Sequence, residues 1–137
     1  ILKIMKFLKL IIVFFSLQTI NAQQIDTISY IKQFEVNKVN YIGKPLSVLL
    51  NDMTKMQPKT VWFSSNINDK NNITASLFKF STKEKSFKNA VTLLIKWKEK
   101  IPFKNVEYLL KKNKFFFTEE EKDFYGEKII QDILVFR

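Results

Sequence analysis

The chain has 137 residues, of which 23 are Lys or Arg and 13 are Asp or Glu, and its formal net charge is +10. It contains no histidine and no cysteine, which excludes a Ser/His/Asp triad, a cysteine nucleophile, a disulfide and any metal site built from imidazole or thiolate. Its two glycines, Gly43 and Gly126, lie too far apart to form a phosphate-binding glycine loop.

Residues 1–22 have the three-part pattern of a secretory signal peptide. A lysine-containing start without acids is followed by a nearly continuous apolar run over residues 10–17, and then by the small residue Ala22. We expect Met5 to be the start, with residues 1–4 as upstream translated sequence, and cleavage between Ala22 and Gln23. Cleavage would remove three lysines and no acid, which lowers the net charge from +10 to +7.

Two alternatives compete with a cleaved signal peptide. A membrane span would need about 20 apolar residues, and the run is far shorter. An uncleaved anchor stays open, because Ile20 is larger than the residue that a cleavage site favours two positions before the cut.

Helical spacing appears twice in the first half of the mature chain. Asp26 or Thr27 can cap a short helix that carries Ile28 and Ile31. Pro45 is suited to a helix start, and four apolar residues then follow at i, i+3, i+4 and i+7: Leu46, Leu49, Leu50 and Met53. We predict a packing helix there.

Three strands are predicted next, over residues 59–65, 73–82 and 89–97, which are short and rich in β-branched and aromatic residues. Short polar islands at 66–72 and 81–86 suit the connections between antiparallel neighbours. The third strand alternates clearly. One side carries Val91, Leu93, Ile95 and Trp97, and the other carries Ala90, Thr92, Leu94, Lys96 and Lys98.

A helix beginning near Pro102, a short helical turn and a last strand complete the pattern. The helix directs Phe103, Val106, Leu109 and Leu110 inward. Thr118 and Glu121 match a capping box for a single short turn that Gly126 can end. In the strand over 127–136 we expect one face to carry Ile129, Ile133 and Val135, and the other to carry Ile130, Leu134 and Phe136.

These elements predict one α+β domain over residues 23–137. We expect an antiparallel four-stranded sheet with two or three helices packed on one face, in the order α-α-β-β-β-α-β.

Lysines gather on one face at the end of the third predicted strand and continue beyond it to Lys100. Lys96, Lys98 and Lys100 are our choice of contact for a polyanion. Solvation of an ordinary surface is the simpler explanation of most lysines. Specific nucleic-acid binding is not expected, because Arg137 is the only arginine and bidentate phosphate recognition favours arginine.

Carboxylates are the remaining route to catalysis, since glycoside hydrolysis needs an acid and a base but no histidine. No spacing pairs the candidates, which are Asp52, Glu84, Glu99, Glu107 and Glu119 to Glu121. No cofactor is implied.

Aromatic residues allow a ligand groove or ordinary packing. Trp62, Trp97, Tyr41 and Tyr108 are the candidates for a groove, although core or rim packing is the commoner use of such rings. Residues 115–117 are three consecutive phenylalanines, so at least one is expected to be exposed or covered by a partner.

The segment ending Asn21-Ala22-Gln23, the phrase from Tyr41 to Asp52 and the Phe124-Tyr125-Gly126 turn resemble small exported proteins of unassigned function from flavobacteria. The resemblance implies a periplasmic or secreted location and supplies no catalytic residue. We therefore expect a non-enzymatic exported domain that acts by surface contact with a protein or polyanion, and that is not an integral membrane protein after cleavage. The alternative is a small carboxylate-dependent hydrolase or a carbohydrate-binding module.

Overall fold

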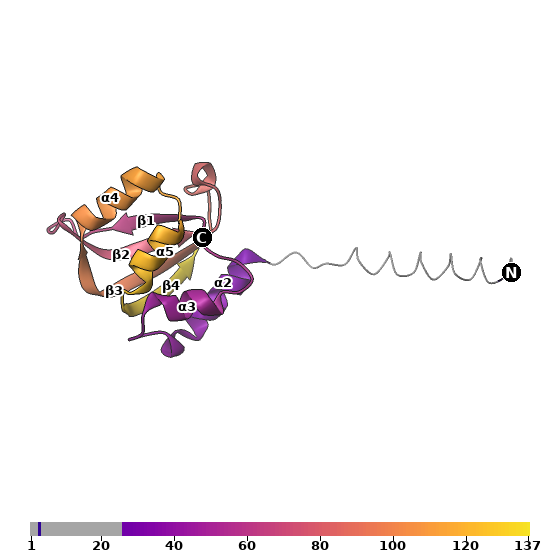
Figure 1. Cartoon of the computed structure of the whole chain (residues 1–137). Helices are drawn as coiled ribbons and strands as arrows, with labels where there is room; N and C mark the ends of the chain where they lie inside the picture. The colour runs from indigo at the N-terminus through magenta and orange to yellow at the C-terminus, as the bar shows by residue number, and fades with distance from the viewer. Residues whose placement is uncertain (1–2, 4–25) are drawn as a thin grey trace.

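The computed structural model describes Lys3 and residues 26–137, so the expected cleavage site at Ala22 and Gln23 lies outside the described residues. The described helices are α2 (Thr27–Val36), α3 (Leu46–Asp52), α4 (Phe103–Asn113) and α5 (Glu119–Gly126), with short 3₁₀ helices η2 (Lys38–Asn40) and η3 (Lys83–Lys85). The strands are β1 (Thr60–Ser64), β2 (Asn72–Lys79), β3 (Thr92–Pro102) and β4 (Ile130–Phe136) (Figure 1). Among the described residues, no helix has the length and apolar character that a membrane crossing requires.

The α+β class and the four-stranded antiparallel sheet are confirmed, with the strands in the order β1-β2-β3-β4. The helix count differs in one place, because the expected single turn after Thr118 is the eight-residue helix α5. The order is therefore α-α-β-β-β-α-α-β. That the helices gather on one face of the sheet stays a prediction.

Local signals located the helix ends well. The Thr118 capping box is present, and α5 ends at Gly126. Asp26 occupies the N-cap position of α2, but its carboxylate accepts a hydrogen bond from the Ser29 hydroxyl at 2.7 Å and not from the helix backbone.

Alternate residues of β3 divide between the core and the surface as predicted. Leu93, Ile95 and Trp97 are at most 3% exposed and belong to one hydrophobic cluster with buried residues of all four α-helices. Lys96 and Lys98, which point the other way, are exposed. We call the side of the sheet that carries Lys96 its second face.

The face predicted for Ile130 is wrong. Lys96 pairs with Asp132 while the next residue, Trp97, pairs with Ile130, so Gln131 is an extra residue in β4. Such a β-bulge shifts the alternation by one residue. Ile130 therefore shares the core side with Ile133, and it is 1% exposed.

Both edges of the sheet are covered by chain from elsewhere. Residues 115–117 pair with β1 through Val61 N–H to the Phe115 carbonyl (3.0 Å) and Phe117 N–H to the Lys59 carbonyl (2.9 Å). At the β4 edge, the Lys32 ammonium of α2 donates to the Val135 carbonyl at 3.1 Å, and the Val135 N–H donates to Glu35 at 3.3 Å. Covered edges leave few backbone groups for unwanted strand pairing.

The two glycines should respond oppositely to alanine. Gly126 lies in α5, and a Cβ there would meet the Ser47 Cβ at 3.6 Å, an ordinary contact. Gly126→Ala should raise the free energy of unfolding by about 0.5 kcal/mol, because alanine loses less backbone entropy in a helix. Gly43 has φ +80°, so Gly43→Ala should lower the free energy of unfolding by about 1 kcal/mol although nothing lies within 4 Å. Urea denaturation of both variants checks this, and equal effects would contradict it.

Candidate functional site

The three lysines chosen from the sequence line one hollow on the second face of the sheet. Lys96, Lys98 and Lys100 surround a space of about 470 Å³. The other residues that line it come from β1 to β4 and are Ser64, Thr74, Ala75, Leu94, Trp97 and Gln131. We call this space the lysine hollow.

The packing of Trp97 directs its two lysine neighbours outward. Its ring is 3% exposed, stacks on Tyr125 of α5 with 5.8 Å between ring centroids, and donates its indole N–H to the Ser76 hydroxyl at 2.9 Å. Successive side chains of a strand point to opposite faces. Burial of this one ring therefore places Lys96 and Lys98 on the second face.

The hollow forms where β3 leaves register with both neighbouring strands. Ala75 pairs with Lys96 and Ile73 pairs with Ile101, so Thr74 alone faces the β3 segment 97–100. On the other side, Gln131 is the extra residue of β4. Bulges bend a strand and redirect side chains. The irregularity brings Gln131 to the lysines, and the sequence contained no signal for it.

The lining residues supply positive charge and hydrogen-bonding groups but no carboxylate. Ser64, Thr74 and Gln131 provide polar groups beside the three lysines. Within the described residues, Lys96 and Lys98 form no ion pair, and the nearby carboxylate of Asp132 is bound by Lys38 at 2.8 Å.

Lys100 differs from the other two lysines of the hollow in forming an ion pair within the described part of the chain. Its ammonium lies 2.8 Å from Asp69 in the turn between β1 and β2. Asn72 donates to both oxygens of the same carboxylate, at 3.1 and 3.2 Å. The hydrogen bonds from Lys100 and Asn72 lower the pKa of Asp69, so its carboxylate stays ionised at more acidic pH than an ordinary aspartate does.

An apolar row crosses the sheet beside the hollow. The register places one residue from each strand directly opposite the next: Trp62, Leu77, Leu94 and Leu134. All four are half-buried, and none belongs to the core cluster. Leu94 also lines the lysine hollow, so apolar and cationic surfaces are continuous there.

Most of the aromatic candidates pack inside the protein. Trp97 and Tyr41 are buried, and the Tyr41 hydroxyl donates to Asp52 at 2.8 Å. Trp62 lies between Phe87 and Phe115, with centroid distances of 4.6 and 4.4 Å. Only Tyr108, 62% exposed, presents an open ring. Of the three consecutive phenylalanines, Phe116 is exposed, which confirms that the run cannot face inward as a whole.

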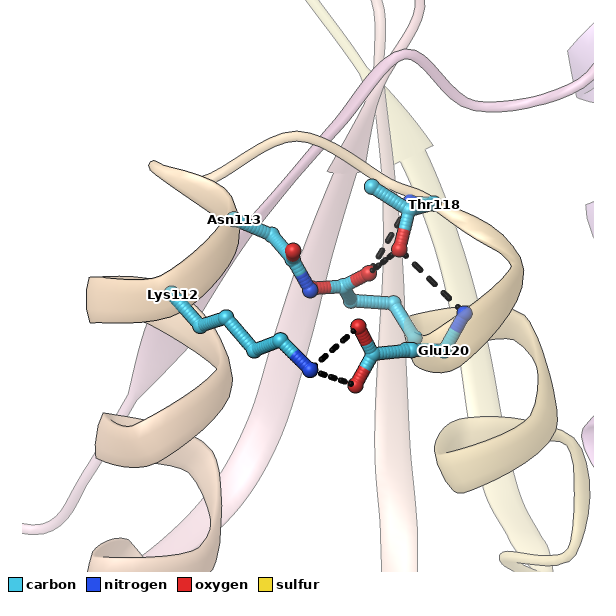
Figure 2. Close-up of polar contacts among 5 residues, drawn as sticks. Lys112, Asn113, Thr118 and Glu120 are labelled. Atoms are coloured by element: carbon cyan, nitrogen blue, oxygen red, sulfur yellow. Dashed lines mark hydrogen bonds and ion pairs between the residues drawn. The ribbon is translucent and has the colours of Figure 1, made fainter.

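Several carboxylate candidates have structural partners. Glu107 pairs with Lys111 at 2.9 Å, and Glu120 pairs with Lys112 at the same distance. Glu121 is 2% exposed and accepts hydrogen bonds from Asn113 Nδ2 (2.6 Å), the Thr118 N–H (2.9 Å) and the Thr118 hydroxyl. Figure 2 shows the contacts of Lys112 and Asn113, at the end of α4, with the start of α5. Their evident role is to hold the two helices together.

Two further hollows, both among the described residues, are each lined by two carboxylates, and in one of them Glu120 and Asp123 lie beside Tyr108. In the other, Asp123 of α5 and Glu127, the residue after that helix, line a space of about 770 Å³ beside α3, together with Lys122. Both carboxylates are exposed. A general acid is usually held in an apolar pocket, whereas Glu120, Asp123 and Glu127 are all exposed to solvent.

The α4–α5 contacts allow a paired test of stability. Glu121→Gln should lower the free energy of unfolding by about 2 kcal/mol, because an amide donor would then face donors from Asn113 and Thr118 in a buried site. Glu120→Gln should change it by less than about 1 kcal/mol, because its pair with Lys112 is exposed to solvent. Urea denaturation measures both, and equal losses would contradict a structural role for Glu121.

Comparison of the chain with protein-family models, with curated proteins and with solved structures found no match. The lysine hollow and its surroundings are therefore the basis for the functional proposal.

Proposed function

We propose that the chain is an exported, non-enzymatic domain that binds an acidic polymer by surface contact at the lysine hollow. One observation carries the proposal: three lysines line a single concave space, and none of the described residues that line it is acidic. A negatively charged ligand placed there would meet three cations within one site.

The chemistry of the site suits a polymer with repeated negative groups. Lysine presents a compact, mobile charge and does not impose the two-pronged geometry of arginine. Recognition would then follow charge density more than the shape of one anionic group. The polar side chains of Ser64, Thr74 and Gln131 can add hydrogen bonds to hydroxyl or carbonyl groups of the same polymer.

The expected location agrees with this ligand class. The basic and apolar pattern of residues 1–22 is typical of export, so the domain is proposed to work in the periplasm or outside the cell. Acidic polysaccharides are the polyanions that such a protein would meet there, and a protein with an acidic surface is the alternative partner. The small carboxylate-dependent hydrolase is less well supported, because Asp123 and Glu127 are both exposed.

The proposal predicts a local effect of lysine removal. In the full chain, Lys96→Ala with Lys98→Ala should weaken binding to heparin, which serves as a model polyanion. The slope of log binding constant against log salt concentration should become shallower by roughly one to two. Lys44→Ala with Lys55→Ala removes the same charge from other exposed positions and is the matched control. It should change the slope much less.

Binding can be measured by elution from immobilised heparin and by titration at several salt concentrations. Equal losses of heparin affinity in the two double variants would contradict a localised site. Binding would then depend only on the overall positive charge of the protein. Retention that does not weaken with salt would contradict the electrostatic account altogether.

A further inference from the structure

A second basic surface lies in the connection between β2 and β3, away from the lysine hollow. Residues 81–90 include Lys83, Lys85 and Lys88 around Phe87, with Glu84 as the only acid, and we call this segment the basic loop. Figure 1 shows a loop between β2 and β3 extending from the body of the molecule. The ring of Phe87 is 72% exposed.

The base of the basic loop is held firmly while its tip is exposed. Ser86 is fully buried. Its hydroxyl donates to the Thr82 carbonyl at 2.9 Å and lies 3.3 Å from the Thr60 hydroxyl. The buried Lys79 ammonium donates to the Ser86 carbonyl at 2.5 Å. These contacts fix the residue before Phe87, so the ring is directed outward by the fold.

The ring of Phe87 contacts the body of the protein at Trp62 and Lys79. It meets Trp62 edge-on, with 4.6 Å between centroids, and the Lys79 ammonium lies 4.8 Å from its centroid. Along the chain this exposed ring lies between Lys85 and Lys88, which are also exposed. An aromatic ring among cations is a combination that suits the boundary between lipid headgroups and acyl chains.

A small cationic hollow lies directly beside the basic loop. Lys85 and Lys88 line it together with Arg137 and Ser81, and its volume is about 220 Å³. Among residues 26–137, no acidic residue lines this hollow. The Ser81 hydroxyl is buried and has no hydrogen-bond partner within the described part of the chain. A space of this size and charge can receive one phosphate group.

We propose that the basic loop docks on an anionic lipid bilayer, with Phe87 at the headgroup boundary and a lipid phosphate in the hollow lined by Lys85, Lys88 and Arg137. Attraction by anionic lipids adds about a factor of five in affinity for each lysine near the surface. The basic loop and the lysine hollow lie toward opposite ends of β3, because the loop precedes Thr92 whereas Lys100 lies near Pro102. The two surfaces can therefore be tested separately.

The experiment uses the full chain labelled at one introduced cysteine, since the natural sequence has none. A polarity-sensitive fluorophore at Thr82→Cys, an exposed position in the basic loop, should brighten with vesicles of 30% phosphatidylglycerol in phosphatidylcholine. It should not brighten with phosphatidylcholine alone. The same fluorophore at Val39→Cys, 81% exposed in η2, is the positional control and should respond much less.

Two changes in the labelled protein test the parts of the loop. Lys85→Ala with Lys88→Ala should lower the partition coefficient about 25-fold, whereas Lys44→Ala with Lys55→Ala should lower it much less. Phe87→Ser should reduce the brightening while anionic vesicles still attract the protein. Because these side chains are exposed, circular dichroism and the unfolding midpoint should stay close to those of the parent protein.

Three results would overturn the proposal. Equal brightening at positions 82 and 39 would show that another part of the chain carries the protein to the bilayer. Equal responses to neutral and anionic vesicles would remove the role of the lysines. Brightening with inorganic phosphate or heparin in the absence of vesicles would assign the basic loop to a soluble anion.

Discussion

The inward packing of Trp97 is the constraint on which the exposed chemistry of this protein depends. Its ring joins β3 to α5 by stacking on Tyr125 and is held by a hydrogen bond to Ser76 of β2. Phe78 contacts both rings edge-on, with centroid distances of 6.4 and 5.6 Å, so three elements meet at one aromatic cluster. Aromatic pairs of this kind contribute about 0.5–1.5 kcal/mol beyond the burial of their area. Without disulfides, such packing must supply the stability.

The same packing explains how a charged surface is obtained from a strand in the centre of a sheet. An inner strand with lysine on alternate residues needs one face in contact with solvent. Trp97 supplies the apolar contact on the core side, and Lys96 and Lys98 remain on the second face. The long side chains are then available to a ligand and not committed to the interior.

The irregularities of β3 and β4 convert that charged face into a concave site. A regular sheet would present its lysines on a gently twisted surface. Here β3 has more residues than β2 over one stretch and fewer than β4 over another. The resulting bend brings Thr74 and Gln131 beside the lysines, while Asp69 in the β1–β2 turn holds only Lys100. Two separate cationic surfaces, the lysine hollow and the basic loop, thus lie at different ends of one fold.

The sequence by itself determined the features that depend on near neighbours along the chain. Alternation placed Leu93, Ile95 and Trp97 on one side of β3, and the spacing of apolar residues at i and i+3 located α3. The capping box of Thr118 and Glu121 marked the start of α5. Each of these patterns lies within a few residues of the chain. Only the tertiary structure decided which residues join the lysines and on which side Ile130 lies. Both outcomes depend on the register between neighbouring strands, that is, on how many residues each strand has between one paired position and the next. No local sequence pattern encodes this register.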